Sequence, residues 1–185
     1  MGDTIHRRPI PKRPPNGWLA WLATVGYISQ EHSADAALTL RIYPMGADAI
    51  GWGAKMTWAE HVEEVHDALS FAAALRDLWQ RVNDNHRIFK TSAAAFRQPS
   101  HYSDDSWLDP DTGSALTRIM DVTGAAFGDD WQLIMVYHPT DAPDSRVLAR
   151  LVARSNSVDV TGSGASLRDA CSSLYRAAAP NYFQH

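Results

Sequence analysis

Two serine-initiated helical segments, 96 residues apart, restrict the possible folds of this chain more than any other feature. One begins at Ser70 (SFAAALRDLWQRV) and the other at Ser166 (SLRDACSSLYRAA). Apolar residues in both segments recur with the period of an amphipathic helix, and serine is a preferred N-cap residue. If the same elements also precede both helices, the chain contains one structural unit used twice.

The segments that precede these helices correspond as well. RIYP ends at Pro44 and VYHP ends at Pro139, an offset of 95 residues. Apolar alternation and short apolar runs predict three strands in each half. These strands are 37–44, 50–58 and 62–65, followed by 131–139, 146–155 and 158–162. The run over 131–139 (WQLIMVYHP) is apolar nearly throughout, which is typical of a strand buried on both faces.

An amphipathic helix is also predicted ahead of each set of strands, one through Trp18 and Val25 and the other through Leu116 and Ile119. The predicted fold is therefore α+β, with two similar helix–three-strand–helix units and antiparallel sheet whose helices lie on one face. The expected segments are an extended arm (1–16), a first unit (17–89), a polar connector (90–113) and a second unit (114–185). The two units would either pair strand edges into one six-stranded sheet or stack their open faces.

Composition supports a packed core, because 45% of the residues are hydrophobic and 21% are charged. No apolar run approaches the ~20 residues of a membrane span, and the basic N-terminus lacks the apolar segment of a secretory signal. Cys171 is the single cysteine, which excludes an intrachain disulfide and a cysteine-based zinc cluster. We therefore expect a soluble cytoplasmic protein with no membrane partner.

Basic residues and prolines distinguish the arm from the rest of the chain. Arg7, Arg8, Lys12 and Arg13 against Asp3 give residues 1–16 a charge of +3, so the remainder carries −7 of the total of −4. The prolines favour extended backbone. The four basic residues are candidate contacts to a protein partner or to a second copy of the chain, and the alternative is a disordered tail.

Trp52 and Trp58 are the other candidate partner-binding residues. They flank GAKMT on one face of a predicted strand, and Gly51 and Gly53 leave room there for a flat group or a second backbone. Aromatic side chains are enriched at protein interfaces. The alternative is a place in the core, where a tryptophan buries a large area.

A nucleic-acid-binding role is the first alternative, with the arm and Arg146, Arg150 and Arg154 forming one basic stripe. The order helix–three strands–helix resembles that of the double-stranded-RNA-binding domain, which holds phosphates with lysines at the start of its last helix. Here the matching position offers Arg168 followed by Asp169. Because phosphate binding depends on several cations, this resemblance implies little RNA affinity for that helix.

Enzyme and metal sites have weaker signals. His61 and His66 are five residues apart, which places them on opposite faces of a strand and off the i, i+4 spacing of a helical zinc pair. Asp109, Asp111 and Gly113 resemble the start of a calcium loop, but the twelfth position is not the required glutamate. We predict no metal or cofactor. An enzyme would need a cleft between the two units that holds His138 or the acids of 104–111.

These observations favour a non-enzymatic binding or assembly protein. It is expected to dock through the arm and through an aromatic or open sheet face. No set of residues supplies a nucleophile, a base and an orienting group together.

Overall fold

A computed structural model describes most of the chain outside the arm and the connector. The described residues are 22, 25–26, 28–30, 33–46, 49–86 and 110–183. Residues 22, 25–26 and 28–30 are helical. The strands and helices that follow are β1 (Ala37–Pro44), β2 (Ile50–Trp58), β3 (His61–Ala68), α2 (Phe71–His86), α3 (Pro110–Phe127), β4 (Gln132–Tyr137), β5 (Val147–Ala153), β6 (Val158–Gly164) and α4 (Leu167–Tyr182).

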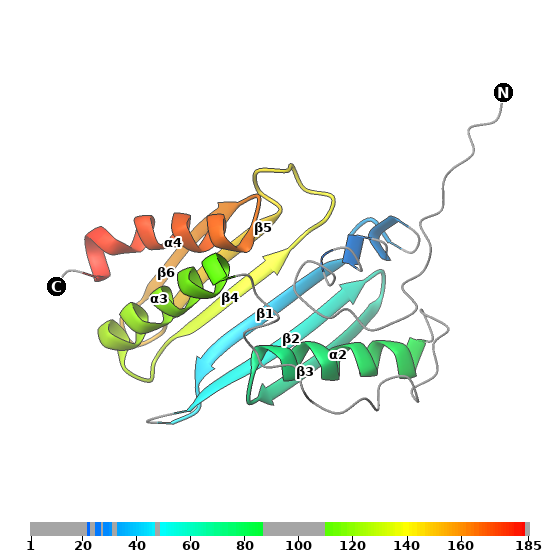
Figure 1. The fold of residues 1–185 in the computed structure, drawn as a ribbon, viewed down its shortest axis with the longest axis horizontal. Coiled ribbons are helices and arrows are strands. Elements are labelled where there is room, and N and C mark those ends of the chain that lie inside the picture. Colours follow the sequence, from blue (N-terminus) through cyan, green and yellow to red (C-terminus); the bar gives the residue numbers. More distant parts are fainter. Residues whose placement is uncertain are drawn as a thin grey trace.

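The six strands form one antiparallel sheet in the order β3-β2-β1-β4-β5-β6 (Figure 1). The two halves of the chain therefore join edge to edge, through β1 and β4, as one of the two arrangements predicts. The helices α2, α3 and α4 lie on one side of this sheet, which confirms the predicted α+β class (Figure 1).

The central pairing is symmetrical in sequence. Leu40 on β1 lies opposite Met135 on β4, and these residues are 95 positions apart, the same offset that relates Pro44 to Pro139. A two-fold rotation that exchanges the two halves brings each residue at its axis opposite the corresponding residue of the other half. The pairing of Leu40 with Met135 meets this condition. The order strand–strand–strand–helix occurs in both halves, while their origin by duplication stays a prediction.

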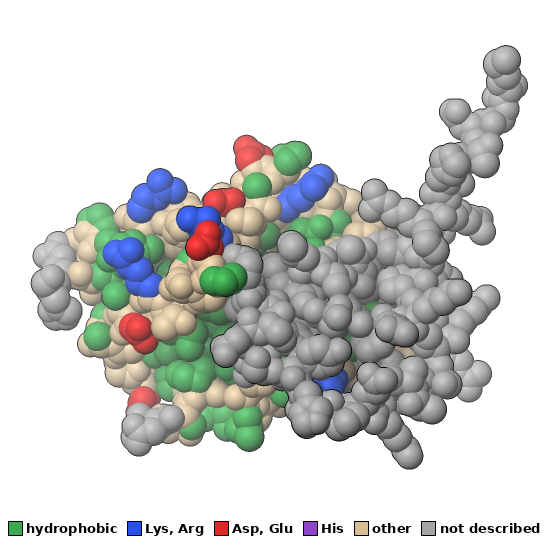
Figure 2. Space-filling model, viewed as in Figure 1, with side chains coloured by type: hydrophobic (Ala, Val, Ile, Leu, Met, Phe, Trp, Pro, Cys, Tyr) green, Lys and Arg blue, Asp and Glu red, His purple; other side chains and the backbone are tan. Residues whose placement is uncertain are grey.

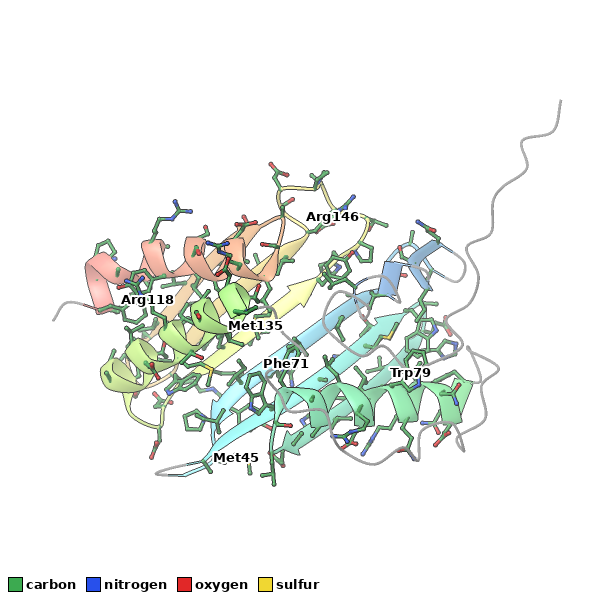
Figure 3. The ribbon with its side chains drawn as sticks, viewed as in Figure 1. Met45, Phe71, Trp79, Arg118, Met135 and Arg146 are labelled. Carbon is green, nitrogen blue, oxygen red and sulfur yellow. The ribbon has the colours of Figure 1, made fainter. Side chains whose placement is uncertain are left out.

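One continuous core fills the space between the sheet and the helices. Alternate residues of the strands point into it, including Leu40 and Met135 at the centre. From α2, Phe71 and Trp79 pack into the same core, and Figure 3 shows their positions along that helix. Because a single buried cluster includes residues of both halves, the halves share their hydrophobic stabilisation.

Both serine caps that the sequence predicts are present. The Ser70 hydroxyl accepts a hydrogen bond from the Ala73 amide at 3.2 Å, and the Ser166 hydroxyl accepts one from the Asp169 amide at 3.1 Å. Each bond satisfies an amide in the first turn that has no partner within the helix.

Two helix ends differ from the prediction. α3 begins at Pro110, inside the segment predicted to be the polar connector (90–113), because proline suits the first turn, where an amide has no intrahelical acceptor. α4 continues through Pro180 to Tyr182, and the Phe183 amide donates to the Ala179 carbonyl at its end. Proline in the last turn removes one amide without preventing the final residues from remaining helical.

Gly162 and Gly164 bring β6 and α4 into close contact. Both lie in β6 beneath α4. A Cβ atom at Gly162 would lie 2.1 Å from the Leu174 backbone nitrogen, and one at Gly164 would lie 2.6 Å from that of Ala170. These glycines therefore allow α4 to approach the sheet backbone closely.

Candidate functional site

The sheet face opposite α2, α3 and α4 is the candidate site, and we call it the open face. Successive side chains of a strand point to opposite faces, so the neighbours of core residues point here. On β4 the core takes Leu133 and Met135, which leaves Ile134 and Val136 on the open face. Within the described residues, no helix or strand covers this face.

Four apolar side chains on the open face form what we call the β4–β5 patch: Ile134, Val136, Leu148 and Val152. Val136 lies directly opposite Leu148, so these two side chains are cross-strand neighbours. Leu148 is 38% exposed, and the other three are partly buried. The outward positions of an antiparallel sheet with one solvated face are ordinarily polar, so the patch departs from this pattern.

Two ion pairs lie on either side of Ile134, and the one made by Arg150 lies within the patch, between Leu148 and Val152 on β5. Arg41 on β1 and Arg150 on β5 both lie opposite Ile134. Arg41 binds Glu64 on β3 at 2.8 Å, and Arg150 binds Asp159 on β6 through two hydrogen bonds of 2.7 and 2.5 Å. The bonds from Arg150 hold the pKa of the Asp159 carboxyl below its usual range. Both arginines are thus neutralised by carboxylates of the same chain.

Gly53 allows Arg41 to reach across the intervening strand. Gly53 on β2 lies opposite Arg41, and a Cβ atom there would be 3.6 Å from the Arg41 Cβ and 3.2 Å from the Val65 carbonyl oxygen. Since no side chain stands at this position, the guanidinium extends over β2 to Glu64 on the edge strand. The glycine that the sequence assigned to an aromatic face therefore serves an ion pair.

Tyr43 crosses the open face in the same direction. A Cβ atom at Gly51 would lie 2.7 Å from the Tyr43 ring, so the ring occupies the space this glycine leaves. The Tyr43 hydroxyl donates to the Asp67 carboxylate at 2.8 Å and accepts from the Asp67 amide at 2.9 Å. Asp67 has a positive φ of 56°, and the register of β2 and β3 shifts between Trp52 and Ala54. These bonds fix the irregular segment of the edge strand.

The predicted aromatic face lies on the other side of the sheet. Trp58 is 3% exposed, and Trp52 packs edge-to-face against Phe71 of α2 with ring centroids 5.6 Å apart. Both rings therefore belong to the interior between sheet and helices. Their binding of a partner stays a prediction that this placement does not favour.

The predicted arginine stripe is divided between different environments. Arg150 is on the open face and is paired with Asp159, as described above. The Nε atom of Arg146 donates to the Asp141 carbonyl at 3.2 Å, near the start of β5 (Figure 3). Arg154 lies in the β5–β6 turn, beside Asp130. The four basic residues of the arm lie outside the described residues.

The histidine motif separates as the strand period predicts. His61 faces the helices, where its ring lies 4.7 Å from that of His86, and His66 lies 3.7 Å from Glu64 on the open face. His86 in turn contacts the Glu63 carboxylate at 2.8 Å. Among the described residues, no group of three or more histidine, cysteine or acidic side chains is arranged to hold a metal ion.

A cleft of about 460 Å³ lies between the two halves, where the β1–β2 turn faces α3. Ile50, Met120 and Trp131 give it apolar walls, and Asp121 and Asp129 add two carboxylates. Neither His138 nor Asp111, the described members of the predicted catalytic set, lines this cleft. The cleft therefore does not contain the two predicted catalytic residues that the structure describes.

The β4–β5 patch was not predicted from the sequence, although the residues that indicate it are present. The strand over 131–139 was predicted to be buried on both faces, yet of its paired residues only Leu133 and Met135 are buried in the core, and Tyr137 packs against it. The outward pair, Ile134 and Val136, lies on the open face. Such a patch is predicted when an apolar run forms a central strand of a sheet and helices cover only one side of that sheet.

The surface over α3 and α4 carries charges of both signs (Figure 2). Figure 2 shows basic and acidic side chains interspersed over α3 and α4, where Arg168 pairs with Asp111 at 2.9 Å.

Comparison of the chain with protein-family models, curated proteins and solved structures finds no match. None of the described helices combines the length and the apolar character needed to cross a bilayer.

Proposed function

We propose that this chain is a non-enzymatic binding or assembly protein that docks through its open face. The β4–β5 patch carries the proposal, because it places apolar side chains on a sheet face that no described element covers. Burying such side chains releases water from apolar surface, at roughly 25 cal/mol per Å² before the costs of association. The Arg41–Glu64 pair beside the patch resembles the polar rim of a protein interface, and the Arg150–Asp159 pair lies within the patch.

The proposal is tested by placing a charged side chain in the patch and measuring whether the chain loses its complexes. Leu148→Glu places a carboxylate beside Val136, and Leu69→Glu makes the same change at a leucine that is 82% exposed and outside the sheet. Complexes of the purified full-length chain, with itself or with added cell extract, are quantified by light scattering and pull-down. We expect Leu148→Glu to remove complexes that Leu69→Glu retains. Equal behaviour of the two folded variants and the wild type would contradict the proposal.

A further inference from the structure

We infer that the occupant of the open face is the open face of a second copy of this chain. The product is a dimer in which two six-stranded sheets pack face to face, with the helices outside. This inference rests on the proposed docking function and names its partner. Three properties of the open face support it: its shape, its charge and its size.

The shape of the face suits a copy of itself. All β-sheets twist with the same hand, and two twisted sheets pack with strand directions about 30° apart and about 10 Å between sheets. A two-fold dimer requires a self-complementary patch, since each residue must meet the partner's surface in the reciprocal way. The side chains of the β4–β5 patch on two copies interdigitate in such an arrangement.

The charge of the face favours a copy over nucleic acid. Arg41 and Arg150 are neutralised by Glu64 and Asp159 within the chain, so they are not available to release counterions from phosphates. A second copy brings the same apolar patch and the same closed ion pairs. Stacking then leaves Arg41, Glu64, Arg150 and Asp159 paired within each chain, and it also desolvates Lys55, which lies opposite Glu64 on the same face.

The size of the face is close to that of a specific interface. Six strands span about 24 Å at ~4.8 Å spacing, and strands of 6 to 9 residues are roughly 20–30 Å long at ~3.3 Å per residue. The flat area is therefore about 500–700 Å², before the relief of the side chains is added. A stable interface buries about 800 Å² per partner, so one such face approaches what a specific dimer needs.

Light scattering of the purified full-length chain across a concentration series tests the inference. We expect a particle of twice the 20.5 kDa chain mass, and a dimer dissociation constant raised at least tenfold by Leu148→Glu but unchanged by Leu69→Glu. Circular dichroism and thermal unfolding establish that both variants fold. A wild-type chain that stays monomeric at high concentration would overturn the inference.

Thiol labelling gives a second measurement that needs no charged variant. Cys171 is 1% exposed, so a cysteine placed at 148 or 69 supplies the reactive thiol. We expect maleimide to label Leu148→Cys at least tenfold more slowly at dimer-forming than at dimer-dissociating concentrations, with Leu69→Cys unaffected. Labelling of Leu148→Cys that is slow at every concentration would show that the chain covers its own open face, which contradicts the second copy as occupant.

The outcomes also separate this inference from the proposed function. A monomeric wild type that loses a different protein partner through Leu148→Glu would refute the second copy and retain docking through the open face. A chain whose mass and partner capture are both unchanged by Leu148→Glu would refute both.

Discussion

Cys171 on α4 shows how burial of one residue shapes the pH dependence of the whole chain. Its side chain is 1% exposed, and burial raises the pKa of the thiol from about 9 to about 12. The folded chain therefore keeps this proton at pH values where the unfolded chain loses it. The associated stability is complete below about pH 9 and is lost as the pH rises toward 12, by at most ~1.4 kcal/mol per pH unit.

Cys171→Ala removes this contribution, so its free energy of unfolding should fall less steeply than that of the wild type between pH 9 and 11. Urea denaturation at pH 7, 9, 10 and 11 measures the slope. Ser172→Ala is the matched control, because Ser172 is the exposed neighbour on the same helix and should retain the wild-type slope. Parallel curves for Cys171→Ala and wild type would show that the thiol does not resist ionisation in the fold.

Residue periodicity predicted which face of each strand enters the core more reliably than it predicted what each residue does. The alternation over 50–58 placed Trp52 and Trp58 on one face, as observed. It gave no information on whether helices or solvent cover that face, because this depends on the position of α2, which follows later in the chain. The role of Gly53 beside Arg41 was unpredictable for the same reason, since it requires the order of three strands.

At the scale of elements, the packing of α4 on β6 depends on Gly162. A Cβ atom there would lie 2.1 Å from the Leu174 nitrogen and 2.6 Å from the Leu174 Cα, both backbone atoms that move only if α4 moves. We expect Gly162→Ala to lower the free energy of unfolding by about 1–3 kcal/mol, as overpacking of a core does. Urea denaturation, with circular dichroism to detect the helices, measures the change.

Gly124 in α3 is the control for this substitution. A Cβ atom at Gly124 would meet nothing within 4 Å, and alanine is the better helix former by up to ~1 kcal/mol. Gly124→Ala should therefore leave stability unchanged or raise it. If Gly162→Ala behaved like Gly124→Ala, the close approach of α4 would not be the reason for glycine in β6.

The elements themselves were largely predictable, because strand and helix periods are local signals. The strands over 37–44 and 50–58 occur with the predicted bounds. Departures occur where the local signal is ambiguous. The strand at 62–65 extends to His61–Ala68, since pairing with β2 orders polar residues that carry no alternation of their own. The start of α3 at Pro110 was assigned to the polar connector, because proline and aspartate favour both turns and the first turn of a helix.

At the scale of the whole molecule, the open face follows from the way the halves join. Edge pairing through β1 and β4 places all described helices on one side, and this leaves the apolar residues Ile134 and Val136 on the other side of the central strand β4. The sequence analysis allowed both edge pairing and face stacking, so it predicted an open face without locating it. Edge pairing within the chain leaves face stacking available to a second copy.

The same joining predicts that the two halves depend on each other. Their shared core and the pairing of Leu38–Ile42 with Leu133–Tyr137 mean that separation would expose buried side chains and the hydrogen-bonding edges of both central strands.

A protease site inserted within residues 90–109 allows the chain to be cut after β3 and α2 and before α3 and β4. We expect the cut protein to elute as one complex under native conditions and to unfold in one cooperative transition. The midpoint should fall with dilution, because the second half is then held by association. Two fragments that separate and remain folded would instead make each half an autonomous domain, whose contact at β1 and β4 is a docked interface and not the centre of one fold.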